Sequence, residues 1–133
     1  MICMNKRGFG RIGEISAALY LESLGFEIVG RNIYVGRCEI DVIAKSHELL
    51  LFVEVKTRRQ VPGVKSIYGR PASAVNYTKR QNMLDAARRY LYENREATQD
   101  LQPRLDIIEV YVDPTDTAYR VLDIKHFPNA VHG

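Results

Sequence analysis

Apolar residues recur along this 133-residue chain in two patterns, one with helical spacing and one of short β-branched runs. The predicted segments are a helix over residues 10–24, strands over 26–35, 38–44 and 49–57, a helix over 74–94, and strands over 105–112 and 119–124. Residues 58–73 combine glycine, proline and basic side chains, so we expect a mobile loop. The order α-β-β-β-α-β-β, without repeats or an internal boundary, predicts a single α/β domain over residues 1–133.

The turn between the second and third predicted strands brings two acids together. Only Ser46-His47-Glu48 interrupts the apolar pattern there, a length that suits a hairpin. If the reversal centres on the last two of these residues, residues whose numbers sum to 95 face each other, and Asp41 lies opposite Glu54. Cross-strand partners have Cβ atoms about 4.5–5.5 Å apart, so the two carboxylates could share one cation. Lys56 projects from the same face of its strand as Glu54.

Two interpretations of this acid pair remain open. A charge pair on a hairpin is usually a solvated surface feature. The surrounding pattern favours a half-buried site instead, because Ile43 and Phe52 share the face of the acids. The opposite face is apolar throughout and carries Ile40, Val42, Ala44, Leu51, Val53 and Val55. Strands that are apolar on both faces are covered on both sides, and buried carboxylates cost free energy unless they are paired or hold a metal ion. We therefore expect a functional site.

The composition is that of a soluble globular protein, with 46% hydrophobic and 26% charged residues. No apolar run approaches the roughly 20 residues of a membrane span, and the first residues do not resemble a signal peptide. We therefore expect a cytoplasmic protein without a membrane partner, in which Cys3 and Cys38 stay reduced. The three histidines are too scattered to predict a zinc site.

The net charge of +3 conceals a strong asymmetry along the chain. Residues 56–89 hold nine basic residues and one acid, a net charge of +8, whereas the rest of the chain has ten basic residues and fifteen acids, a net charge of −5. A basic segment that begins at the lysine of an acid site suits a polyanion, most simply a nucleic-acid backbone. The alternative is a basic surface that serves solubility.

An acid on the second strand, followed by Glu54-Val55-Lys56 on the third, resembles the core of the PD-(D/E)xK nuclease superfamily, which has the restriction-endonuclease-like fold. Further residues extend over nearly the whole chain: Gly13-Glu14, Ala17, Leu21, Gly25-Phe26, Arg31-Asn32, Glu39-Ile40-Asp41-Val42-Ile43-Ala44, Phe52-Val53-Glu54-Val55-Lys56 and Arg104-Leu105-Asp106. Together they resemble the YraN-type family of small bacterial proteins. Two positions depart from these patterns, since Ile40 stands where a proline often precedes the acid and Cys38 stands where glycine is usual.

The superfamily resemblance implies a mixed five-stranded sheet flanked by helices, and a bound Mg²⁺ or Mn²⁺. It implies that Asp41, Glu54 and the carbonyl of Val55 hold this ion. Lys56 would orient the attacking water or stabilise charge on phosphorus. Oxygen ligands favour the same hard cations on chemical grounds. The similar layout of archaeal Holliday junction resolvases implies a further catalytic acid on the first helix, for which Glu14 is the matching position; an ordinary exposed acid near a helix start is the alternative.

Other charged residues receive weaker roles. Four are candidate nucleic-acid contacts: Lys79, which could reach a phosphate beside the ion, and Arg58, Arg59 and Arg80, which would follow the backbone. Each is equally explained as a solvated charge, and no residue that reads a base sequence is evident. Glu39 could support the site or pair with Lys56, and Asp106 could form a structural ion pair with Arg104.

The predicted function is a divalent-metal-dependent nuclease that hydrolyses phosphodiester bonds of DNA, with branched or damaged DNA as candidate substrates. Two alternatives remain open. One is a non-catalytic nucleic-acid-binding module that retains the nuclease fold and binds DNA without needing Asp41, Glu54 or added metal. The other is a partner protein whose basic segment docks an acidic protein. Branched DNA would suit a symmetric homodimer, as in the related resolvases.

Overall fold

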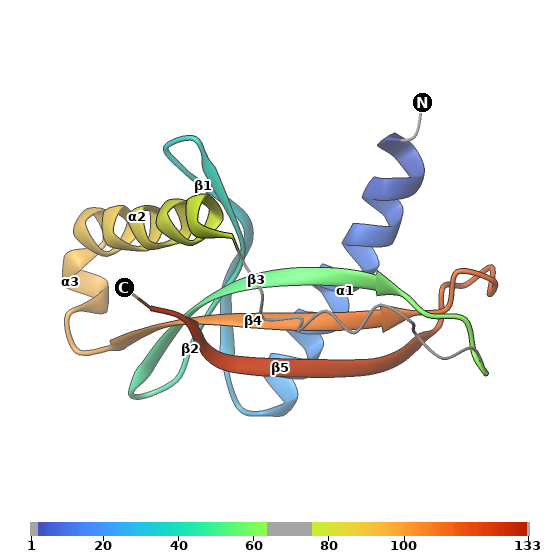
Figure 1. Ribbon diagram of the computed structural model, residues 1–133. Helices are drawn as coiled ribbons and strands as arrows, with labels where there is room; N and C mark the ends of the chain where they lie inside the picture. Colours follow the sequence, from blue (N-terminus) through green and yellow to red (C-terminus); the bar gives the residue numbers. More distant parts are fainter. Residues whose placement is uncertain (1–2, 64–75, 133) are drawn as a thin grey trace.

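The computed structural model of the chain describes residues 3–63 and 76–132 (Figure 1). Its elements are α1 (Cys3–Ser23), β1 (Glu27–Val35), β2 (Cys38–Lys45), β3 (Leu49–Arg59), α2 (Tyr77–Glu93), α3 (Arg95–Thr98), β4 (Gln102–Val112) and β5 (Val121–Val131). The order of the two long helices and five strands is the predicted one. The four residues of α3 are too few to show a helical period in the sequence. Residues 64–73 of the predicted loop, and 74–75 of the second predicted helix, lie outside the described residues.

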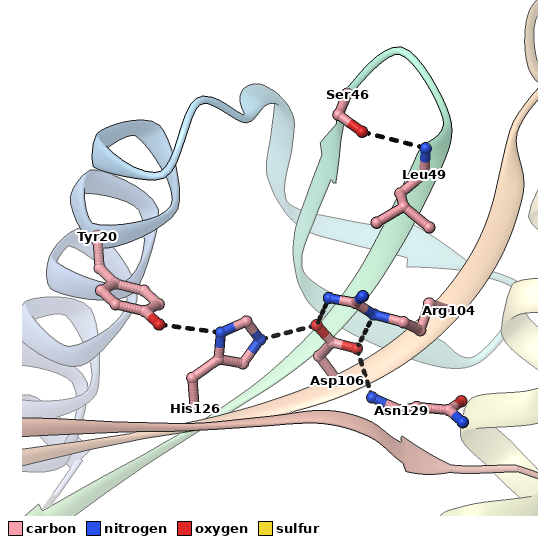
Figure 2. Close-up of polar contacts among 7 residues, drawn as sticks. All are labelled: Tyr20, Ser46, Leu49, Arg104, Asp106, His126 and Asn129. Atoms are coloured by element: carbon pink, nitrogen blue, oxygen red, sulfur yellow. Dashed lines mark hydrogen bonds and ion pairs between the residues drawn. The ribbon is translucent and has the colours of Figure 1, made fainter.

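The five strands form one mixed sheet in the order β1-β2-β3-β4-β5. β3 and β4 run parallel, and every other neighbouring pair runs antiparallel. A parallel pair needs a long crossover connection, which here contains α2 and α3. The turn between β2 and β3 is closed by Ser46, whose Oγ accepts the backbone N–H of Leu49 at 3.1 Å (Figure 2). The α/β fold with a mixed sheet flanked by helices is therefore confirmed.

The two long helices pack on opposite faces of the sheet. α1 packs through Leu21 against the layer that contains Val42. α2 packs through Leu84 against the layer that contains Ile43 and Phe52. Successive side chains of a strand point to opposite faces, so the central strands are apolar on both sides. Among the described residues, no helix combines the length and the apolar character that a membrane crossing requires.

The position of Ile40 differs from the prediction. Ile40 packs with Ile43 and Phe52 beneath α2, whereas Val42 packs on the side of α1. The last pair between β2 and β3 is Val42 with Val53, and beyond it β2 pairs only with β1. This end of the β1–β2 hairpin turns away from β3 and rises beside α2 (Figure 1). Ile40 lies in this part of β2 and packs on the α2 side of the sheet.

β5 extends seven residues beyond the predicted strand end, to Val131. The extension includes Pro128, which ordinarily marks the end of a strand because it cannot donate a ladder hydrogen bond. β5 is an edge strand, where a missing donor costs little, and its register with β4 shifts between Leu105 and Ile107. Asn129 follows the proline with φ of 52°, a left-handed conformation that asparagine tolerates. The register shift and the left-handed conformation of Asn129 together let β5 continue past Pro128.

A buried polar cluster joins α1 to β4 and β5 (Figure 2). The Asp106 carboxylate is fully buried and accepts hydrogen bonds of 2.9 Å from Arg104 Nε, Arg104 Nη2 and the backbone N–H of Asn129. His126 Nε2 lies 2.8 Å from the same carboxylate, and His126 Nδ1 lies 3.0 Å from the Tyr20 hydroxyl on α1. Burial acts to raise the pKa of Asp106, but the hydrogen bonds from His126, Arg104 and Asn129 outweigh it and lower the pKa. The ion pair expected between Asp106 and Arg104 is confirmed.

We expect Asp106→Asn to destabilise the fold by about 3 kcal/mol or more, because Arg104 and His126 lose their buried carboxylate. Since folding lowers the pKa of Asp106, its stabilising effect is complete above the unfolded value of about 4 and is lost as the pH falls through the lower folded value. Urea unfolding from pH 7 to pH 3 measures both effects.

Wild type should lose stability below about pH 4 more steeply than Asp106→Asn. Asp100→Asn, at an exposed position, is the control and should change stability by less than about 0.5 kcal/mol. Equal pH dependence in wild type and Asp106→Asn would contradict the role given to this carboxylate.

Candidate metal centre

β2 and β3 separate at the two acids that the sequence pattern places opposite each other. The register is the predicted one, but pairing ends at Val42 with Val53, one step before Asp41 and Glu54. The Asp41 carboxylate instead accepts the backbone N–H of Val55 at a distance of 2.8 Å. This hydrogen bond fixes the Asp41 carboxylate at the point where the strands part.

Three carboxylates converge at this point. Oxygen atoms of Asp41, of Glu14 on α1 and of Glu39 on β2 all lie within 4.8 Å of one another. Asp41 and Glu14 are partly buried, and Glu39 is exposed. The structure therefore places Glu14, the acid expected from the first helix, beside Asp41. It also places Glu39 within the cluster, although its position in the sequence indicates only a supporting role.

α1 comes close enough to β3 to deliver Glu14 because the preceding residue is a glycine. A Cβ at Gly13 would overlap the hydroxyl of Thr57 on β3, so a larger residue would push α1 away from the sheet. Gly8, on the same helix, has open space around the position of a Cβ. Gly13 thus sets the distance between helix and sheet, and Glu14 occupies the resulting position beside the strands.

Asn32 on β1 contacts Glu14, although the sequence assigns it no role. It adopts φ of 52°, in the left-handed region that asparagine tolerates better than most residues. Its side chain forms a hydrogen bond with the Glu14 carboxylate, which acts to lower the pKa of Glu14. The only sequence signal for a role of Asn32 is the Arg31-Asn32 pair, which is among the residues that resemble the YraN-type family. The contact of Asn32 with Glu14 joins β1 to α1, so local sequence pattern could not predict it.

Burial and mutual repulsion raise the pKa values of the clustered acids. The pKa of Asp41 rises to about 7, first because of burial and then because of the nearby charge of Glu54. The N–H of Val55 opposes this rise, and the charges of Glu14 and Glu39 add to it. Burial also raises the pKa of Glu14. A divalent cation would relieve the repulsion among these groups, so the cluster has the charge and the oxygen donors that such an ion requires.

Glu54 is not among the three converging carboxylates of the described residues. It forms an ion pair with Lys79 on α2, with 3.0 Å between Glu54 Oε2 and Lys79 Nζ. Lys56 lies two residues further along β3. Burial, followed by the charge of Arg58, lowers the pKa of Lys56, and the charge of Glu54 acts in the opposite direction. The second acid of the predicted pair is therefore neutralised by an ammonium group from α2.

The three arginines that are predicted to contact nucleic acid differ in the interactions that they make within the protein. Arg58 Nε forms an ion pair of 3.2 Å with Glu109, a buried acid on β4 that the sequence pattern does not single out. The Arg59 guanidinium lies 5.1 Å from the ring centre of Phe9. Arg80 is exposed in the first turn of α2. Arg58 and Arg59 therefore make contacts that support the fold, independently of any ligand.

A cleft of about 480 Å³ opens beside the carboxylates, within the range of about 300–1,000 Å³ that is typical of ligand sites. Its charged lining residues are Glu14, Arg37, Glu39, Asp41, Glu54 and Lys79. The cleft thus offers carboxylates for a metal ion and cations for a phosphate group. Lys56 does not line it, so its predicted contact with the reacting phosphate requires a substrate that extends beyond the cleft or a movement of the side chain.

The fold and the site define an α/β protein with a carboxylate cluster where two strands of a mixed sheet part. The chain belongs to the Uncharacterised protein family UPF0102, whose model matches residues 13–110. That range contains the three converging acids, Glu54 and Lys56. The resemblance to the YraN-type family is therefore confirmed.

Relatives from several bacteria match most of the chain. The UPF0102 protein of Caldicellulosiruptor saccharolyticus is 35% identical over 127 residues, which cover 96% of this chain and 99% of the relative. The UPF0102 protein of Syntrophotalea carbinolica is 40% identical over 121 residues, which cover 91% and 89%. The UPF0102 protein of Caldanaerobacter subterraneus is 39% identical over 127 residues, which cover 96% and 97%.

We expect Gly13→Ala to destabilise the protein by about 1–3 kcal/mol, because the added methyl group overlaps Thr57 and forces α1 from the sheet. Gly8→Ala is the matched control and should be neutral or stabilising by up to about 1 kcal/mol. Thr57→Ala removes the overlapping hydroxyl and should restore most of the loss in the double variant. Urea unfolding of wild type, the three single variants and the double variant Gly13→Ala/Thr57→Ala measures the effect. Equal stability of Gly13→Ala and Gly8→Ala would show that the close approach does not constrain α1.

Proposed function

We propose that the chain is a divalent-metal-dependent nuclease that hydrolyses phosphodiester bonds of DNA, with branched DNA as a candidate substrate. The convergence of the Glu14, Glu39 and Asp41 carboxylates at the wall of an open cleft carries this proposal. Repulsion among partly buried acids costs stability, which a purely structural role would not explain. The proposal includes a cytoplasmic location and, for branched DNA, a symmetric homodimer.

The residues present fit a hard divalent cation, Mg²⁺ or Mn²⁺. The donor atoms gathered near Asp41 are carboxylate oxygens, which these ions prefer. Asp41 would hold the ion together with Glu14 and Glu39, or together with Glu54 and the carbonyl of Val55 as the superfamily resemblance implies. When bound, an ion of this kind polarises phosphate oxygens and lowers the pKa of a bound water.

The side chains around the cluster would bind and orient the DNA strand. Arg37 and Lys79 line the cleft and would contact phosphate oxygens along its path. Arg80, on the same helical turn as Lys79, would extend this contact along the backbone. Such contacts position DNA without reading its sequence. Lys56 would donate a hydrogen bond to a phosphate oxygen as charge develops there, or orient the attacking water.

Two observations favour a second candidate, a non-catalytic nucleic-acid-binding module with the same fold. Lys79 neutralises Glu54, and Lys56 lies outside the lining of the cleft. Of the four predicted catalytic residues, Glu54 is thus already paired with a cation and Lys56 does not line the cleft. Such a module would bind DNA through its basic residues in a salt-dependent manner, without a requirement for metal.

Cleavage of labelled single-stranded, duplex, flapped and four-way-junction DNA, with Mg²⁺ or Mn²⁺, tests the nuclease proposal. We expect metal-dependent cleavage to fall at least about 100-fold in Asp41→Asn and in Lys56→Ala, with DNA binding retained in the same samples. Glu22→Gln removes an exposed acid from α1 and is the matched control, with wild-type activity expected. DNA binding without cleavage of any substrate, unchanged in all variants, would overturn the nuclease proposal and support the binding module.

A further inference from the structure

Lys79 reaches from the first turn of α2 to the acids on the strands. Its Nζ lies 3.0 Å from Glu54 Oε2, and the side chain of Glu54 is 13% exposed whereas that of Lys79 is 49% exposed. Burial acts to lower the pKa of Lys79, but Glu54 and the nearby charge of Asp41 raise it overall. The ammonium group therefore supplies positive charge to both acids.

The ion pair between Lys79 and Glu54 can be replaced by contacts of each residue with a ligand. Ion pairs with a half-exposed partner contribute little to stability, because water and salt screen them. The first turn of α2 contains no acidic residue, and the positive end of a helix dipole disfavours a cation there. The acids across the cleft are thus what favours this position of the Lys79 ammonium, and a stronger anion could draw it away from Glu54.

We propose that Lys79 is an exchangeable counter-ion, which neutralises Glu54 in the free protein and releases it when a nucleic-acid phosphate binds the ammonium group. Release leaves the Glu54 carboxylate available to a divalent ion. The proposal rests on the proposed function, because it requires that the cleft take a metal ion and a phosphodiester. It adds a regulation of that site, in which metal and nucleic acid favour each other's binding.

The coupling follows from competition for two groups. Lys79 and a divalent ion compete for the carboxylate of Glu54, and a phosphate competes with that carboxylate for the ammonium. Each ligand therefore favours the rearrangement that the other ligand needs. Thermodynamic linkage makes the effect reciprocal, so DNA should raise the affinity for metal by the same factor by which metal raises the affinity for DNA.

Isothermal titration calorimetry with Mn²⁺, in the presence and absence of a phosphorothioate oligonucleotide, tests this coupling without requiring cleavage. Mn²⁺ binding to the oligonucleotide alone is measured separately and subtracted. Lys79→Met removes the charge and keeps the apolar stem. Arg95→Met removes an exposed cation from α3 that does not line the cleft, and it is the matched control. Urea unfolding confirms that each variant is folded, and Lys79→Gln is the second variant if Lys79→Met is not.

Without DNA, Lys79→Met should bind Mn²⁺ about threefold or more tightly than wild type, because the competing ammonium group is gone. DNA should raise the Mn²⁺ affinity of wild type and Arg95→Met, and Lys79→Met should lose most of that gain. Mn²⁺ binding by Lys79→Met that is no tighter than that of Arg95→Met would overturn the proposal. It would show that Lys79 supports Glu54 rather than exchanging with the metal.

Failure of the proposed function gives a different result. Coupled binding of Mn²⁺ and DNA, without cleavage of any substrate, would support the counter-ion role and remove the catalytic one. Absence of Mn²⁺ binding in both wild type and Lys79→Met would overturn the counter-ion role and the metal-dependent function together.

Discussion

The separation of β2 from β3 beyond Val42 and Val53 is the constraint on which the rest of the site depends. Because the ladder ends there, the N–H of Val55 binds the side chain of Asp41. The freed end of the β1–β2 hairpin rises beside α2 (Figure 1). Glu39 belongs to the part of β2 that pairs only with β1. The cleft lies beside this separation, and Glu14 enters it from α1. If the β2–β3 ladder continued past Val42, the backbone N–H of Val55 would bond to the backbone of β2 and would no longer be available to the Asp41 carboxylate.

α1 is positioned by two contacts on either side of Glu14. At Gly13 the helix touches Thr57, which fixes its distance from β3. Two turns further on, Tyr20 contacts His126, which in turn binds the buried Asp106 carboxylate (Figure 2). A site on a helix that is held in this way is more rigid than one on a loop. The structural role of the Asp106 cluster therefore extends to the placement of a candidate metal ligand.

The sequence predicts the strands and the register of this region because a slip of one residue would turn Ile43 and Phe52 away from their core. That register brings Asp41 near Glu54. The point at which pairing ends is not predictable from local pattern, since it depends on how α2 and the hairpin pack together. For this reason the prediction that Ile40 shares a face with Val42 is wrong, and Ile40 packs with Ile43 instead. The contact between Glu54 and Lys79 likewise depends on a crossover helix whose position no local pattern sets. The metal and nuclease roles stay predictions.

We propose above that the carboxylates at the separation of β2 and β3 form a divalent-cation site. Diffraction data from crystals grown with Mn²⁺, collected near the manganese absorption edge, test it most directly. We expect an anomalous difference peak within coordination distance of the Asp41 carboxylate, with further ligands from Glu14 and Glu39 or from Glu54. Absence of a peak in the cleft at millimolar Mn²⁺ would contradict the proposed site. Manganese bound at full occupancy elsewhere on the protein, with no peak at Asp41, would contradict it equally.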